Sequence, residues 1–151
     1  MTTINLVTEI KADKKIVFDL SRNIDVHQTS MTASREKAIA GRTSGLINMD
    51  ETVTWEAKHF GFRLKHQSKI TEMRLHDSFT DEMVKGCFKS FKHAHIFEEE
   101  NGVTKMIDSL QYETPLGILG TFFDWLLLKN YMTQLIRKRN THLKISAEKQ
   151  H

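Results

Sequence analysis

The fold is decided by the stretch TKMIDSLQYETPLGILG, residues 104 to 120, because the apolar pattern changes its period within it. Residues 103–113 alternate between two faces, which predicts a strand. Over residues 118–148 the apolar residues recur with a helical period instead, and Pro115 and Gly117 mark the start of that helix. A long helix with one apolar stripe must bury the stripe, and a curved antiparallel sheet with one apolar face is the available partner.

Upstream of that stretch the chain alternates almost throughout, which predicts strands over residues 51–60, 62–73, 78–86 and 90–99. Gly61 is the expected turn between the first two of these strands, and Asn101-Gly102 predicts a tight hairpin after the last one. The segment 36–47 is interpreted as one more strand, bent at two glycines.

The N-terminal part predicts a half-buried strand over residues 2–11 and two short helices over residues 14–23 and 24–31, the first with Asp13 as its N-cap. The expected fold class is therefore α+β: a curved antiparallel sheet wraps around the long C-terminal helix, and the two short helices after the first strand close one end. A chain of 151 residues suffices for one core, so we expect a single domain over residues 1–151.

The apolar stripe of the C-terminal helix is expected to face the sheet, and its members are Leu119, Phe122, Leu126, Met132, Leu135, Ile136, Arg139 and Leu143. The block LGILGTFFDWLLL, residues 116–128, also carries Phe123 and Leu127 off that stripe. Four roles stay open for these residues: packing against the short helices, a cavity mouth, a lip that touches a membrane, or a contact in a homodimer. The cluster RKRN, residues 137–140, is expected to be a solvated face near the helix end, where cations suit the helix dipole.

Composition favours a soluble globular protein and excludes several classes. The chain has 22 basic and 19 acidic residues, an excess too small to indicate nucleic-acid binding. Its one cysteine, Cys87, excludes an internal disulfide and a CxxC motif, fits a reducing, cytoplasmic setting, and is expected to be a buried, inert thiol. The N-terminus lacks the pattern of a signal peptide, and block 116–128 is shorter than the roughly 20 residues that span a bilayer, so no stable membrane insertion is expected.

The sequence resembles the START-like, or SRPBCC, superfamily over nearly the whole chain. The resemblance is carried by VTWEAKHFG at 53–61, VKGCFKSF at 84–91, HAHIF at 93–97, the stretch at 104–120 and RNTHLK at 139–144. It is closest to a bacterial subgroup of ligand-binding-like proteins that are loosely labelled cell-division inhibitors. One departure is Cys87-Phe88, where the resemblance leads us to expect proline before the phenylalanine.

The resemblance implies a helix-grip fold with the element order given above. It implies no particular reaction, because the superfamily includes lipid carriers, polyketide cyclases/dehydratases, hydrolases and binding proteins on one scaffold. It also implies no cofactor, and metal binding is not general among its members. Function must therefore be argued from the interior of the fold.

Strand alternation predicts that the interior mixes aromatic side chains with four histidines, one carboxylate and one phenol. The residues expected to line a cavity are Trp55, His59, Phe62, Leu64, His66, Phe91, His93, His95, Phe97, Met106, Asp108, Leu110, Tyr112 and, from the helix, Phe122. Ligand pockets are mostly apolar with a few fixed polar groups, so we expect a small hydrophobic or amphipathic ligand, lipid-like or polyketide-like. A one-residue bulge would reverse the assignment of any one strand.

Three roles stay open for the pair His93 and His95, which share one face of a strand. They line the pocket, or they bind a metal with Asp108 and either His59 or His66, or one of them is a general base oriented by Asp108. Buried histidines that are satisfied by a hydrogen bond are commoner than metal ligands, so no metal site is predicted. The catalytic role would make the protein an enzyme of cyclase, dehydratase or isomerase type, whereas a structural role for Asp108 favours simple binding.

Overall fold

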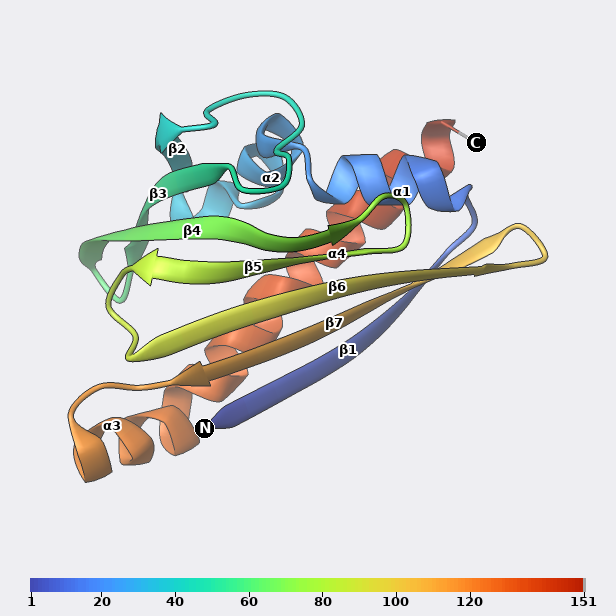
Figure 1. The fold of residues 1–151 in the computed structure, drawn as a ribbon. Helices are drawn as coiled ribbons and strands as arrows, with labels where there is room; N and C mark the ends of the chain where they lie inside the picture. The colour runs from blue at the N-terminus through green and yellow to red at the C-terminus, as the bar shows by residue number, and fades with distance from the viewer. Residues whose placement is uncertain (151) are drawn as a thin grey trace.

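The structure, a computed structural model, describes residues 1–150 and contains one antiparallel sheet crossed by a long C-terminal helix (Figure 1). Its strands are β1 (Thr2–Ile10), β2 (Lys37–Gly41), β3 (Thr52–His59), β4 (Phe62–Arg74), β5 (Ser78–Lys85), β6 (Ser90–Glu100) and β7 (Val103–Glu113). They pair in the order β1-β7-β6-β5-β4-β3-β2, so the first strand lies beside the last.

The helices are α1 (Lys14–Ser21), α2 (Ile24–Ser30), a short 3₁₀ turn (Thr32–Ser34), α3 (Gly117–Phe123) and α4 (Lys129–Gln150), and a π-helical segment (Asp124–Leu128) joins α3 to α4. In Figure 1, α4 runs diagonally across one face of the sheet, with α1 and α2 at the top of the view and α3 at the lower left. The α+β helix-grip architecture expected from the sequence is confirmed. Within the described residues, no helix is long and apolar enough to cross a membrane.

The turns and caps form where the sequence placed them. Phe60-Gly61 and Asn101-Gly102 each connect two strands with positive φ at both positions, the geometry of a tight two-residue hairpin. The side chain of Asp13 caps α1 by accepting from the backbone N–H of Lys15 at 2.7 Å. The sheet register is therefore fixed locally at both hairpins.

The core consists of two clusters of buried side chains between the sheet and α4. The larger cluster joins α1 and the C-terminal half of α4 to the sheet, and it includes Ile10, Val17, Phe18, Phe97, Met106 and Leu143. The smaller cluster joins β1, β7 and the N-terminal half of α4, and it consists of Ile4, Leu110, Tyr112, Leu128 and Ile136.

The apolar stripe that was predicted to face the sheet is wrong at the start of the C-terminal helix, because Leu119, Phe122 and Leu126 are exposed. The buried positions there are instead Gly120, Asp124 and Leu128. A Cβ on Gly120 would lie 1.8 Å from the carbonyl oxygen of Pro115, so the absence of a side chain lets the helix turn pack on that backbone. The π-helical segment then carries a wider turn, which shifts the buried face relative to a regular helix.

Candidate functional site

A cavity of about 780 Å³ lies between the inner face of the sheet and α4. Its wall is mostly apolar and is contributed by strands β3 to β7 and helices α1 to α4. Eight lining residues are also exposed to solvent, and we call five of these the mouth: Phe60, Phe62, Cys87, Leu116 and Leu119. The mouth thus combines the β3–β4 turn, the β5–β6 loop and the start of α3, which all lie at the left end of the view in Figure 1.

Most of the residues predicted for the cavity wall line it, and these are Trp55, His59, Phe62, Leu64, His66, Phe91, His93, His95 and Leu110. Phe97, Met106, Asp108 and Tyr112 are buried on the inner side of the sheet but lie outside the lining. Phe97 and Met106 are instead part of the larger core cluster.

The predicted position of Phe122 is wrong, because its side chain is exposed and lies outside the lining. The expectation of a buried thiol at Cys87 is also wrong, because Cys87 is exposed at the mouth. Both errors fall at or beside irregular structure: Cys87 lies in the loop before β6, and Phe122 lies in α3, shortly before the π-helical segment.

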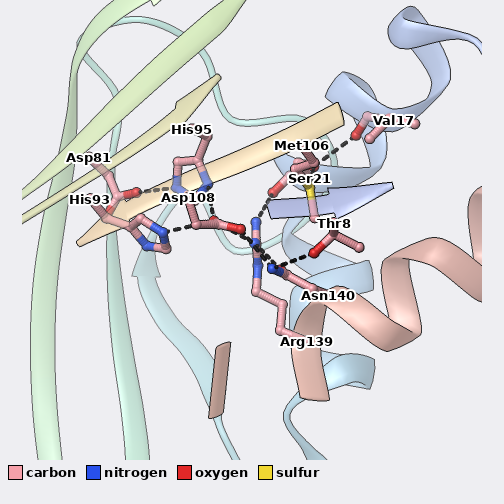
Figure 2. Close-up of polar contacts among 10 residues, drawn as sticks. All are labelled: Thr8, Val17, Ser21, Asp81, His93, His95, Met106, Asp108, Arg139 and Asn140. Carbon is pink, nitrogen blue, oxygen red and sulfur yellow. Dashed lines mark hydrogen bonds and ion pairs between the residues drawn. The ribbon is translucent and has the colours of Figure 1, made fainter. Parts of the chain in front are cut away.

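A buried polar network centred on Asp108 lies behind the cavity wall and reaches it through Asp81, His93, His95 and Arg139 (Figure 2). The carboxylate of Asp108 accepts from His93 Nε2 at 2.9 Å and from Asn140 Nδ2 at 2.7 Å, and Arg139 Nη1 lies 3.5 Å away. His95 donates from Nε2 to Asp81 at 3.0 Å. Its Nδ1 lies 3.2 Å from Asp108, though not in hydrogen-bonding geometry.

Burial alone would raise the pKa of Asp108, but the hydrogen bond from His93, the close His95 and the charge of Arg139 outweigh it and hold this pKa well below the usual range. Burial also acts to lower the pKa of His95, but the carboxylates of Asp108 and Asp81 on either side outweigh it, so the pKa is raised. The pKa of His93 is lowered, first by burial and then by the charge of His95.

The directions of these shifts favour charges of opposite sign within the network. Asp81 and Asp108 are anionic and Arg139 is cationic, and the raised pKa of His95 favours its protonated form between the two carboxylates. His93 is neutral, and because its Nε2–H donates to Asp108, its Nδ1 carries the free lone pair. The cavity wall at His93 is therefore uncharged and presents a hydrogen-bond acceptor.

The sequence interpretation missed three members of this network: Asp81, Arg139 and Asn140. The cluster RKRN was expected to be solvated throughout, and this is wrong for Arg139 and Asn140, which are buried against Asp108. One signal did exist in the sequence, because Arg139 falls on the apolar stripe of the helix. A cation on an apolar stripe needs a buried partner, and Asp108 is that partner.

Two further polar pairs line the cavity. His59 Nδ1 lies 2.5 Å from the hydroxyl of Tyr131, and His27 Nε2 lies 2.7 Å from Glu36. Burial lowers the pKa of His59 and of His66, which favours their neutral forms. The neutral forms of His59 and His66 therefore add hydrogen-bonding capacity to the wall without adding net charge.

One group in the cavity wall has the composition of a metal site. Asp81, His93 and His95 each offer a ligand atom, and the three atoms lie within 4.8 Å of one another. This set differs from the one drawn from the sequence, because Asp108 already accepts from His93 and Asn140 and faces Arg139. His95 Nε2 is likewise engaged by Asp81, so a metal would have to displace that hydrogen bond.

No protein-family profile matches the chain, and no curated protein sequence matches it. Solved structures do match: a START superfamily protein from Mycobacterium smegmatis shares 10% identity, covers 99% of both chains and has a TM-score of 0.74. A protein from Thermus thermophilus shares 14% identity over 97% of this chain and 99% of that chain, with a TM-score of 0.72.

A third structure, major latex-like protein 151 from Panax ginseng, shares 16% identity over 93% of this chain and 96% of that chain, with a TM-score of 0.62. Identities this low carry information about the fold alone. The order of strands and helices, the long C-terminal helix and these matches agree with the resemblance found in the sequence. The chain therefore has the START-like, or SRPBCC, helix-grip fold.

Proposed function

We propose that the protein binds a small hydrophobic or amphipathic ligand, lipid-like or polyketide-like, inside the cavity. The observation that carries this proposal is the cavity itself, whose volume of about 780 Å³ lies between the sheet and α4. Sites for small molecules commonly have volumes of about 300–1,000 Å³ and apolar walls with a few placed polar groups. The aromatic and aliphatic lining supplies the apolar contact, and the histidines supply the polar groups.

The polar groups also favour one chemical feature of the ligand. His93 is neutral and its Nδ1 accepts hydrogen bonds, so a ligand with a hydroxyl or enol group suits this wall. A ligand carboxylate suits it less, because its anionic oxygens would meet the lone pair of His93 Nδ1 with no proton between them.

Tryptophan fluorescence gives a direct test, because the chain has two tryptophans in different places. Trp55 lines the cavity, whereas Trp125 is exposed and lies outside the lining. In Trp125→Phe, a brominated long-chain alcohol in the cavity should quench Trp55, and the unbrominated alcohol should not. Trp55→Phe is the matched control, and its remaining Trp125 should be quenched little at the same concentration.

Quenching of Trp125 without quenching of Trp55 would place the alcohol on the surface and contradict the proposal. Native mass spectrometry of freshly purified protein addresses a ligand that is already bound. An excess mass of a few hundred daltons that disappears on denaturation would support cavity binding and define the ligand class. An excess equal to one divalent metal ion would point instead to Asp81, His93 and His95.

A second candidate is an enzyme of cyclase, dehydratase or isomerase type. The observation that favours it is the 2.9 Å hydrogen bond from His93 to Asp108, which holds a neutral imidazole in one tautomer at the cavity wall. Such a base would take a proton from the carbon beside a ligand carbonyl and become an imidazolium next to the Asp108 carboxylate. To test this step, a 3-oxoacyl thioester is incubated with the protein in deuterated water, and replacement of that proton by deuterium is monitored by NMR.

His93→Ala separates the two candidates. For an enzyme, this variant should lose deuterium exchange and retain quenching of Trp55 by the brominated alcohol. For a binding protein, the wild type should show no exchange above the background of the solution, and His93→Ala should only change the affinity.

A further inference from the structure

The segment from Leu116 to Leu127 exposes more apolar side chain than a surface helix normally does. Six of its large apolar residues are more than half exposed: Leu116, Ile118, Leu119, Phe122, Trp125 and Leu126. Phe123 and Leu127 are also exposed, so only the line through Gly120, Asp124 and Leu128 is covered. A helix that is hydrophobic on all sides is normally buried, and a large exposed apolar patch marks an interaction site.

This apolar surface continues into the mouth of the cavity. Leu116 and Leu119 belong to both, and Phe60 of the β3–β4 turn packs against Phe123 with the ring centroids 5.6 Å apart. Phe60 and Phe62 are themselves exposed beside it. Two elements distant in the sequence therefore build one apolar surface around the opening.

Basic residues are frequent in the segments that carry this surface. The segments that form the mouth, residues 57–66, 84–89 and 113–130, carry the exposed basic residues Lys58, Arg63, Lys65, Lys85, Lys89 and Lys129. Their acidic residues are Glu113, which lies 3.5 Å from Lys89, and Asp124, which is buried and accepts from Tyr112. Arg63 in turn lies 3.8 Å from Glu56, just outside these segments. The remaining four lysines have no such acidic partner among the described residues, so the rim of the apolar surface carries a net positive charge.

We propose that the mouth docks reversibly on the surface of an anionic lipid bilayer. The exposed leucines, phenylalanines and Trp125 would enter the interfacial region, and the lysines and arginine would face the lipid phosphates. A second copy of this chain fits the same surface less well, because its own cationic rim would meet the first one. This proposal extends the proposed cavity binding, because it places an apolar phase, the lipid bilayer, at the opening of the cavity. Its test does not depend on any cavity ligand.

The test uses Trp55→Phe, in which Trp125 is the only tryptophan. The vesicles are phosphatidylcholine alone, or phosphatidylcholine with about 30 mol% phosphatidylserine, each with and without brominated acyl chains. We expect a blue shift and bromine quenching of Trp125 with the anionic vesicles, less of both with the neutral ones, and a decrease as salt is added. Co-sedimentation of the wild-type protein with the same vesicles gives a measurement that needs no substitution.

Variants separate the apolar and the charged contributions. Each substitution is made in the wild-type protein. Trp125→Ser should lower partitioning into vesicles by about tenfold or more, and Lys129→Gln should lower it by about fivefold with anionic vesicles only. Val7→Ser is the matched control, because Val7 is an exposed apolar residue on β1 that lies outside the mouth, and it should leave partitioning unchanged.

Two results would overturn the proposal. One is the absence of any vesicle binding by the wild-type protein at low salt. The other is a dimer in lipid-free solution whose formation shifts Trp125 emission to the blue, which would assign the surface to a second copy of the chain. Neither result changes the quenching of Trp55 by a brominated alcohol in Trp125→Phe, so docking and cavity binding are judged separately.

Discussion

Replacing Asp108 by asparagine should remove a large part of the stability of the fold. The carboxylate is fully buried and contacts His93, His95, Asn140 and Arg139 at 2.7–3.5 Å. The asparagine amide keeps one acceptor oxygen, but its NH2 group adds a donor among groups that already donate. The guanidinium of Arg139 also loses its anion. Breaking a buried charge pair in this way costs about 3–5 kcal/mol, a large share of the roughly 5–15 kcal/mol that stabilises a typical domain.

The same substitution should change the response to acid. The pKa of Asp108 is lowered in the folded state, so its ionisation stabilises the fold at pH values above the ordinary aspartate pKa near 3.8. This stabilisation is lost as the pH falls toward the pKa that Asp108 has in the folded state. The difference between wild type and Asp108→Asn should therefore be largest near neutral pH and narrow on acidification. Urea unfolding followed by circular dichroism, at neutral pH and at about pH 3, measures both effects.

A difference below about 1 kcal/mol at neutral pH, or one that does not narrow in acid, would refute this account of the network. Asp77→Asn is the matched control, since Asp77 pairs with Lys14 at the surface and its replacement should cost much less. If Asp108→Asn does not fold, Asn140→Ala removes one donor to the carboxylate, together with the hydrogen bonds of Asn140 to Arg139 and Thr8, and should cost at least about 1.5–3 kcal/mol.

Tyr112→Phe should destabilise the fold by about 1.5–3 kcal/mol in urea, because it removes the hydroxyl that donates to the buried carboxylate of Asp124. Gly120→Ala should destabilise it by about 1–3 kcal/mol, although alanine favours helices, because the added Cβ would collide with the Pro115 carbonyl. Cys87 should react with a thiol reagent in the folded protein, and a bound brominated alcohol should slow that reaction, because this exposed residue also lines the cavity.

Controls for these changes are available in the same elements. Thr121→Ala at an exposed position of α3 should change the stability little or raise it slightly, so an equal effect at Gly120 would contradict the proposed collision. A thiol at Cys87 that reacts only after unfolding would contradict its exposure.

The sheet and the hairpins were predictable because their causes are local. Alternation assigned the strands, and the glycines after Phe60 and Asn101 marked tight turns that require positive φ. The change of period after residue 113 located the C-terminal helix. These signals do not depend on any partner distant in the sequence, so they could be read directly from the chain.

The composition of the site depends on distant partners, and there the sequence was a weaker guide. Arg139 looks like a surface cation until Asp108, 31 positions away, is known to lie beside it. Asp81 gives no local sign that it meets His95 across a strand pair. Phe122 was misplaced because the covered line is set by contacts at Gly120 and by the π-helical segment, not by a regular period.

The buried core is divided into two clusters that both reach the cavity wall, and this division affects how the molecule can open. The α3 side is attached mainly through Gly120, Asp124 and Leu128, whereas Val17 and Leu143 belong to the larger cluster beyond the cavity. Local opening requires less free energy where fewer apolar contacts are broken. Amide hydrogens of α3 should therefore exchange through frequent local unfolding, whereas those near Val17 and Leu143 should exchange only on global unfolding. Opening at α3 would widen the mouth of the cavity without loosening the cluster that keeps the protein folded.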